Sequence, residues 1–152
     1  MQKILGGVIA FLMFASLAWA EEALPIFDGH MHYSQNSWDT LSLEEVRARM
    51  DKANVPWALV SSSPDAGTLQ LKALMPERII AELRPYHGLV TASNWTQAPG
   101  IADYLARRLE IQKYAGIGEF HLYGPDEYDP KLLGRIAALA VKHGILLHVH
   151  SG

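Results

Sequence analysis

The sequence has no cysteine, no basic patch and no serine-nucleophile motif, and each absence narrows the class of protein. Without cysteine the chain can form neither a disulfide nor a lipid-bearing cysteine anchor. Its 13 basic residues are outnumbered by 16 acidic ones and are nowhere clustered, so the electrostatic footprint that nucleic acid requires is missing. Ser61, Ser62 and Ser63 lie outside any G-x-S-x-G elbow, which disfavours a serine nucleophile. A small molecule is the expected substrate.

The first 20 residues have the pattern of a secretory signal peptide. Lys3 supplies a positive charge, residues 4–17 are almost wholly apolar, and Ala18-Trp19-Ala20 is an A-x-A cleavage pattern. The apolar run of about 14 to 17 residues is shorter than the roughly 20 that a membrane-spanning helix needs, so cleavage is favoured over an anchor. We expect a periplasmic or secreted protein without a stable membrane anchor. Its mature part, residues 21–152, keeps 12 basic residues (13 minus Lys3) against 16 acidic ones.

Apolar runs and helix signals alternate along this mature part. The expected strands are residues 26–33, 57–62, 78–83, 116–122 and 145–150. The expected helices run from the Ser42–Glu45 capping box to about Ala53, from an Asp65 cap to Pro76, from Ile101 to Tyr114, and from Asp129-Pro130 to Gly144. Strands begin about every 30 residues, the size of one β-α unit. The pattern predicts an α/β protein, either an open doubly wound sheet or part of a (β/α)8 barrel.

Polar side chains gather in the C-terminal halves of three expected strands. Because residues two apart share a strand face, acid or imidazole groups line one face of each: Asp28, His30 and His32 on the first, Glu119 and His121 on the fourth, and His148 and His150 on the fifth. A barrel has its active site at this end of its strands. The placement therefore favours the barrel.

The spacing of His30 and His32 is suited to metal binding. Two imidazoles on one strand face can converge on a single ion such as zinc, which takes histidine nitrogen at about 2.0–2.1 Å. Asp28 lies one step deeper on the same face. There it could accept a hydrogen bond from a ligand histidine and so fix its tautomer.

Three segments together resemble the amidohydrolase superfamily, in its amidohydrolase-2 and TatD-like branches. They are Asp28-Gly29-His30-Met31-His32, Gly116-Ile117-Gly118-Glu119-Phe120 and Leu147-His148-Val149-His150. The resemblance implies a metal-dependent (β/α)8 barrel in which His30, His32, Glu119 and His150 hold a divalent metal, with His148 as the alternative to His150. Zinc is the implied metal and manganese the alternative. The implied activity is hydrolysis of a small molecule by a metal-activated water, with Glu119 as catalytic residue; this branch also contains lactone hydrolases and decarboxylases.

The family's later ligands, a sixth-strand histidine and an eighth-strand aspartate, have no counterpart in this sequence. We therefore expect these residues to be a signal peptide and the first five β-α units of a (β/α)8 TIM barrel, truncated from a parent of roughly 250 to 280 residues. Alone, they should fold poorly because two parallel edges stay unpaired, and they should be inactive.

Several residues have a second interpretation. Arg84, which ends the third strand, could hold an anionic substrate group or form a salt bridge at the rim, and His87 shares this ambiguity. His121 is expected at the rim and His143 on a helix surface. Two other functions stay open: a PHP-type phosphoesterase, whose His-x-His start is similar, and a non-catalytic periplasmic barrel domain.

Overall fold

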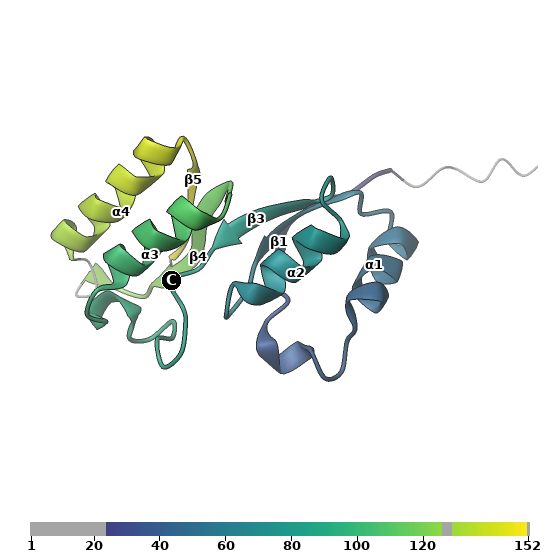
Figure 1. Ribbon diagram of the computed structural model, residues 1–152, viewed down its shortest axis with the longest axis horizontal. Helices are drawn as coiled ribbons and strands as arrows, with labels where there is room; N and C mark the ends of the chain where they lie inside the picture. Colours follow the sequence, from purple (N-terminus) through teal and green to yellow (C-terminus); the bar gives the residue numbers. More distant parts are fainter. Residues whose placement is uncertain (1–23, 126–128, 152) are drawn as a thin grey trace, which may run out of the picture.

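The computed structural model describes residues 24–125 and 129–151, so the predicted signal peptide and its cleavage site lie outside the described residues. Five strands form one parallel sheet in the order β1-β2-β3-β4-β5. They are β1 (Phe27–Met31), β2 (Trp57–Ser61), β3 (Ile79–Leu83), β4 (Gly116–Leu122) and β5 (Leu146–Ser151). The α-helices between them are α1 (Leu43–Lys52), α2 (Ala66–Leu74), α3 (Ile101–Ile111) and α4 (Pro130–His143). Figure 1 shows α1 and α2 near one end of the described chain and α3 and α4 near the other. The predicted alternation of strands and helices is confirmed.

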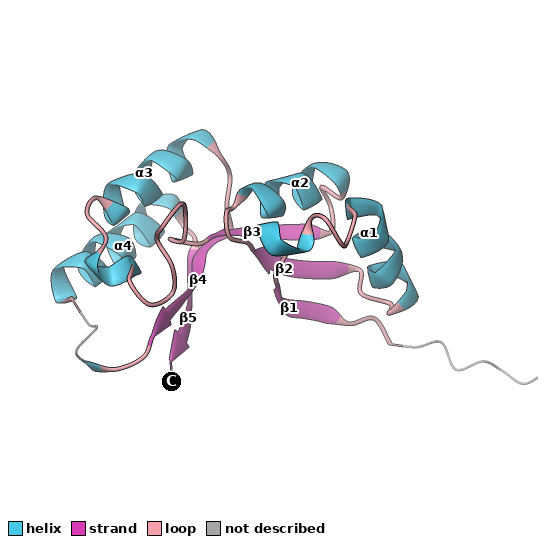
Figure 2. Ribbon diagram, turned by 90° about the horizontal axis from the view of Figure 1, so that it is seen from below, coloured by secondary structure: helices cyan, strands magenta, loops and turns pink. Residues whose placement is uncertain are grey.

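The sheet is curled into a half-barrel. All four α-helices lie on one side of it, and no helix covers the opposite face in the described part of the chain (Figure 2). Each crossover links neighbouring strands, so sequence order and spatial order are the same. The fold is thus α/β, consistent with a partial (β/α) barrel whose edges are β1 and β5. Across residues 24–125 and 129–151, the helices are all too short or too polar to cross a membrane.

Local signals set most helix ends as expected. In α1, the Ser42 hydroxyl accepts from the backbone N–H of Glu45, whose carboxylate in turn accepts from the N–H of Ser42 at 2.8 Å. In α4, Asp129 caps the N-terminus above Pro130, and Gly144 ends the helix in the left-handed conformation at φ 63°.

Two helix predictions need correction. Asp65 is at the N-cap position of α2, but its side chain makes no capping hydrogen bond. Its carboxylate accepts instead from Arg108 Nε at 2.9 Å and from the Tyr114 hydroxyl. Helix α3 ends at Ile111 and not near Tyr114, since Gln112 is already extended, and the Tyr114 hydroxyl reaches Asp65 instead. A tertiary contact has replaced the local cap.

The hydrophobic core lies between the sheet and its helices. One cluster joins α3 and α4 to β3 and β4, with Leu105 and Ile117 fully buried. A second joins α1 and α2 to β1 and β2, around Val60 and Leu71. Each such side chain contributes about 1.5–3 kcal/mol by leaving water. Many apolar side chains of the strands are buried on the helix side, whereas apolar residues of the edge strands, such as Phe27 and Val149, are exposed.

Candidate metal centre

Glu119 is the centre of the polar face. It lies on β4 with 2% of its surface exposed, at a shift in the pairing register with β5 between Gly118 and Phe120. Gly118 has φ 153°, and a Cβ there would lie 2.4 Å from the carbonyl oxygen of His148. Only glycine therefore allows β4 to approach β5 this closely beside the carboxylate.

His30 and His32 converge on one oxygen of this carboxylate. Their Nε2 atoms lie 2.9 Å apart, and each lies 3.3 Å from Glu119 Oε2. Nδ1 of His32 is 2.6 Å from the carbonyl oxygen of Ser61. A carbonyl only accepts, so Nδ1 carries a proton and Nε2 of the neutral ring presents its lone pair to the cluster. Burial lowers the pKa of His32, although the Ser61 hydrogen bond opposes it, and this favours the neutral ring.

The other oxygen of Glu119 meets two further histidines. Nδ1 of His150 donates to Oε1 at 2.8 Å, and Nε2 of His121 lies 3.8 Å from the same atom. The two rings stack with centroids 4.5 Å apart. The Tyr86 hydroxyl fixes His121, because it lies 2.8 Å from Nδ1 and also accepts from the backbone N–H of His121. His121, expected only at the rim, is thus part of the site.

Arg84 is committed to Glu119. Its Nε donates to the backbone oxygen of Glu119 at 3.0 Å and its Nη2 to Oε2 at 3.1 Å. Burial by itself would raise the pKa of Glu119, but the hydrogen bond from His150 and the charges of His30, His121 and Arg84 outweigh it. The net pKa lies below the usual range, so Glu119 is an anion at neutral pH.

His148 packs edge to face against His30, with ring centroids 5.4 Å apart, but its polar contact is to a different carboxylate. Its Nδ1 donates to Glu82 Oε2 at 2.9 Å. Glu82 is 1% exposed, and its Oε1 is one of two fully buried side-chain atoms without a partner among the described residues. Burial raises the pKa of Glu82 against the lowering effect of His148. Sequence reasoning did not select Glu82, though an acid inside the apolar run of β3 is itself a signal.

Asp28 does not make the hydrogen bond expected of it. Its Oδ1 accepts from the backbone N–H of His30 at 3.0 Å, and no described contact joins it to an imidazole ring. The rings of His32 and His150 are instead oriented by Ser61 and Glu119. Asp28 therefore stabilises the backbone at the end of β1, and other groups set the tautomers of the histidines.

The atoms around Glu119 fit a divalent cation. The ligand atoms of a tetrahedral ion with bonds of about 2.0–2.1 Å lie about 3.3 Å from one another. The separations of 2.9, 3.3 and 3.3 Å among His30 Nε2, His32 Nε2 and Glu119 Oε2 have this size. Such electron-rich atoms repel unless a proton or a cation lies among them. Imidazole nitrogen with carboxylate oxygen suits zinc, and the carboxylate also suits manganese.

Glu119, His121 and His150 provide a second set of possible ligand atoms. As in the first set, these atoms all lie within 4.8 Å of one another. The two sets share only Glu119, whose oxygens face opposite groups. His148 belongs to neither set. Of the five metal ligands expected from the sequence, the structure gathers His30, His32, Glu119 and His150 and sets His148 aside with Glu82.

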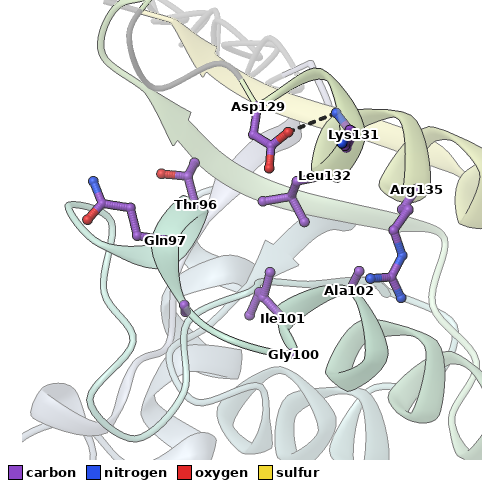
Figure 3. A pocket seen from close by; sticks show the side chains of 10 residues that line it. Thr96, Gln97, Gly100, Ile101, Ala102, Asp129, Lys131, Leu132 and Arg135 are labelled. Carbon is purple, nitrogen blue, oxygen red and sulfur yellow. Dashed lines mark hydrogen bonds between the residues drawn. The ribbon is translucent and has the colours of Figure 1, made fainter.

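A separate hollow of about 220 Å³ contains none of these residues. It lies between the N-terminal ends of α3 and α4 (Figure 3). There Asp129 accepts from the backbone N–H of Lys131 at 2.8 Å, and Arg135 pairs with Asp103. Asp129 and Arg135 thus stabilise the two helices at this hollow.

No protein-family model, curated protein or solved structure significantly matches the chain. Its function must be inferred from the geometry of the site.

Proposed function

We propose that this protein is a metal-dependent hydrolase acting on a small molecule. The observation that supports this best is the division of one buried carboxylate between two groups of imidazoles, His30 with His32 and His121 with His150. A structural histidine cluster has no need of a shared buried acid, whereas a cation-binding site needs anionic charge surrounded by lone pairs. The cluster also lies on the open face of the sheet, where a substrate has access.

The residues would divide the work as follows. His30, His32 and Glu119 hold the metal, and His150 with His121 extends the ligand set on the far side of Glu119. When bound, a divalent ion lowers the pKa of a coordinated water toward about 7 and polarises a carbonyl or phosphoryl oxygen. Ser61 keeps the Nε2 lone pair of His32 directed into the site. Glu119 supplies negative charge, and its depressed pKa makes it a weak base.

The remaining sequence expectations belong to the same proposal. We infer that the half-barrel is the first part of a (β/α)8 barrel of the amidohydrolase type, and that residues 1–20 direct the protein to the periplasm or outside the cell. The resemblance of the three strand segments and the apolar leader support this. Further strands beside β1 and β5 would pair both free edges.

Metal content tests the site. The protein encoded by the complete gene is purified, loaded with zinc or manganese, dialysed and subjected to elemental analysis, alongside a His30→Ala/His32→Ala variant. The control is His143→Ala, which removes a histidine of α4 that pairs with Glu110. We expect metal in the wild type and the control and little in the double variant. Equal metal in all three would refute the site.

Substrate panels then define the reaction. Hydrolysis of model esters, lactones or amides that depends on added metal would support the proposal. Release of phosphate from model phosphoesters would favour a phosphoesterase. Metal binding without turnover of any panel member would favour a non-catalytic barrel domain.

A further inference from the structure

A cavity adjoins the metal centre on the side of Arg84. Its volume is about 400 Å³, and its lining includes Gln35 after β1, Ser63 after β2, and Arg84 and Thr91 after β3. All of these follow the carboxyl ends of parallel strands, the edge at which sheets of this kind bind ligands. Volumes of about 300–1,000 Å³ are usual for small-molecule sites.

The loops around this cavity are tied together. The backbone N–H of Gln35 donates to the carbonyl of Ser63 at 3.1 Å, and the N–H of Ser63 donates to the Ser34 hydroxyl at 3.0 Å. On the opposite side, Trp95 Nε1 donates to the carbonyl of His121 at 2.8 Å, which holds the loop after β3 against β4. The cavity is thus largely formed before a ligand enters.

The cavity has a cationic wall and no acidic one. Arg84 is 8% exposed, and two of its three guanidinium nitrogens are bound by Glu119. The third nitrogen, Nη1, makes no hydrogen bond to a described residue. The fully buried side-chain atoms without a partner in the described chain belong to Glu82 and His143, so Nη1 is not fully buried. Nη1 therefore keeps some exposure, and Arg84 is one of the residues that line the cavity. None of the lining residues, all in the described part of the chain, is aspartate or glutamate.

His87 adds a second polar group at a fixed position. Its Nδ1 donates to the carbonyl of Pro85 at 3.0 Å, and its ring stacks on Tyr104 with centroids 3.7 Å apart. These contacts hold the ring at the wall of the cavity. The lining also includes the neutral side chains of Gln35 and Ser63, which can donate hydrogen bonds to an anion.

We propose that this cavity binds the carboxylate of the substrate through Nη1 of Arg84, so that the protein acts on small carboxylic acids. This assignment rests on the proposed function for the reaction, but the anion site itself stands on the cavity alone. The open donors of a guanidinium suit a planar oxyanion. A carboxylate is favoured over a phosphate because Glu119 already offsets part of the positive charge of Arg84. The remaining positive charge suits an anion with one negative charge better than a dianion. The substrate would extend from the cavity toward Glu119 and its histidines.

The probe is benzoate, compared with neutral benzamide and with phenylphosphonate, titrated calorimetrically into the full protein. Metal is first removed by chelation so that the carboxylate cannot bind an ion. We expect benzoate to bind at least about tenfold more tightly than benzamide, the ratio given by one charge-assisted hydrogen bond. Equal affinities for benzoate and benzamide would overturn the anion site, and tighter binding of phenylphosphonate would overturn the carboxylate assignment.

Two variants locate the binding without disturbing the Arg84–Glu119 contacts. Thr91 is exposed at the cavity wall. Thr91→Glu adds a negative charge there. Thr91→Gln adds a side chain of the same shape without the charge. We expect Thr91→Glu to weaken benzoate binding by about fivefold or more while Thr91→Gln and benzamide binding change little. Equal affinities in the two variants would place benzoate elsewhere.

Removal of the guanidinium gives an independent comparison. Arg84→Met should abolish the preference for benzoate over benzamide, and Arg84→Lys should retain part of it. A preference unchanged in Arg84→Met would refute the role of Arg84. If benzoate binds as expected but elemental analysis finds no metal, the proposed hydrolase fails while the anion site stands.

Discussion

Replacing Glu119 by glutamine is the most informative single change. The substitution keeps the shape of the side chain and removes its charge. The carboxylate serves Arg84 through Oε2 and His150 through Oε1. An amide keeps one accepting oxygen and has an NH2 group in place of the other. If the NH2 group faces Arg84, two donors meet, and if it faces His150, the imidazole must change to its other tautomer to accept from it.

The expected loss in the free energy of unfolding follows from these contacts. Losing one hydrogen bond to a charged group costs about 1.5–3 kcal/mol, and breaking a fully buried ion pair about 3–5 kcal/mol. Arg84 keeps its bond to the backbone of residue 119 and also borders a cavity, so the lower range applies. We expect the free energy of unfolding to fall by about 2–3 kcal/mol and the melting temperature by about 6–12 °C.

Urea unfolding followed by tryptophan fluorescence measures this loss. Trp95 is 1% exposed, lies against Phe120 and donates to the carbonyl of His121, so it reports on β4. The matched control is Glu110→Gln on the surface of α3, which breaks an exposed pair with Lys142 and a longer contact with His143 and should change stability by less than about 1 kcal/mol. Zinc at about 100 times its dissociation constant should stabilise the wild type by about 2.7 kcal/mol, and the Glu119→Gln variant much less.

A double-mutant cycle tests whether the lost stability comes from the ion pair between Arg84 and Glu119. In Glu119→Gln the charge of Arg84 is left uncompensated, whereas adding Arg84→Met removes that charge as well. We expect the two substitutions to be non-additive by about 1–2 kcal/mol, with the double variant more stable than their sum. Strict additivity, or a Glu119→Gln variant as stable as the control, would refute the ion pair as the source of the effect.

The remaining predictions concern the fold. Leu105→Ala in the core should lower the free energy of unfolding by about 2–5 kcal/mol in the same urea assay. Ile111 is 65% exposed, so Ile111→Ala should change it by no more than about 0.5 kcal/mol. Similar losses in the two variants would contradict the core described. Gly116→Ala should cost about 1–3 kcal/mol because its Cβ would meet side-chain atoms at 2.7–2.8 Å, whereas Gly134→Ala in α4 meets nothing within 4 Å and should raise the melting temperature; the opposite order would refute the packing at β4. Burial raises the pKa of Tyr104 to about 12. Its neutral form therefore contributes stability that is complete below the unfolded pKa of about 10 and is lost as the pH rises through about 12. Alkaline unfolding should lose part of this pH dependence in Tyr104→Phe, and an unchanged profile would count against burial of the phenol.

Much of the local structure could be predicted because its signals are local. The expected β4 range, 116–122, has the observed bounds. The capping box of α1 and the glycine end of α4 also formed as predicted, since each depends on atoms only a few residues apart. The cap of α2 failed because Asp65 has a stronger alternative in Arg108 and Tyr114, which are distant in sequence.

The candidate site was only partly readable from the strand pattern. Alternation correctly placed His30 and His32 toward a common face, and the structure joins them to Glu119. The same rule made His148 and His150 equivalent. It could not separate them, because alternation fixes the face on which a side chain lies but not the depth or the neighbour it meets.

The sequence by itself determined the order of strands and helices, the apolar helix side and the polar residues available on the other face. Only the tertiary structure decided which of those residues meet. The stagger and curl of the strands bring Glu119 between two pairs of histidines, direct His148 to Glu82 and turn Arg84 from a free cation into a partner of Glu119. Except for the contact of His121 with Glu119, these contacts join residues 31 to 89 positions apart, and their geometry depends on the packing of the whole sheet.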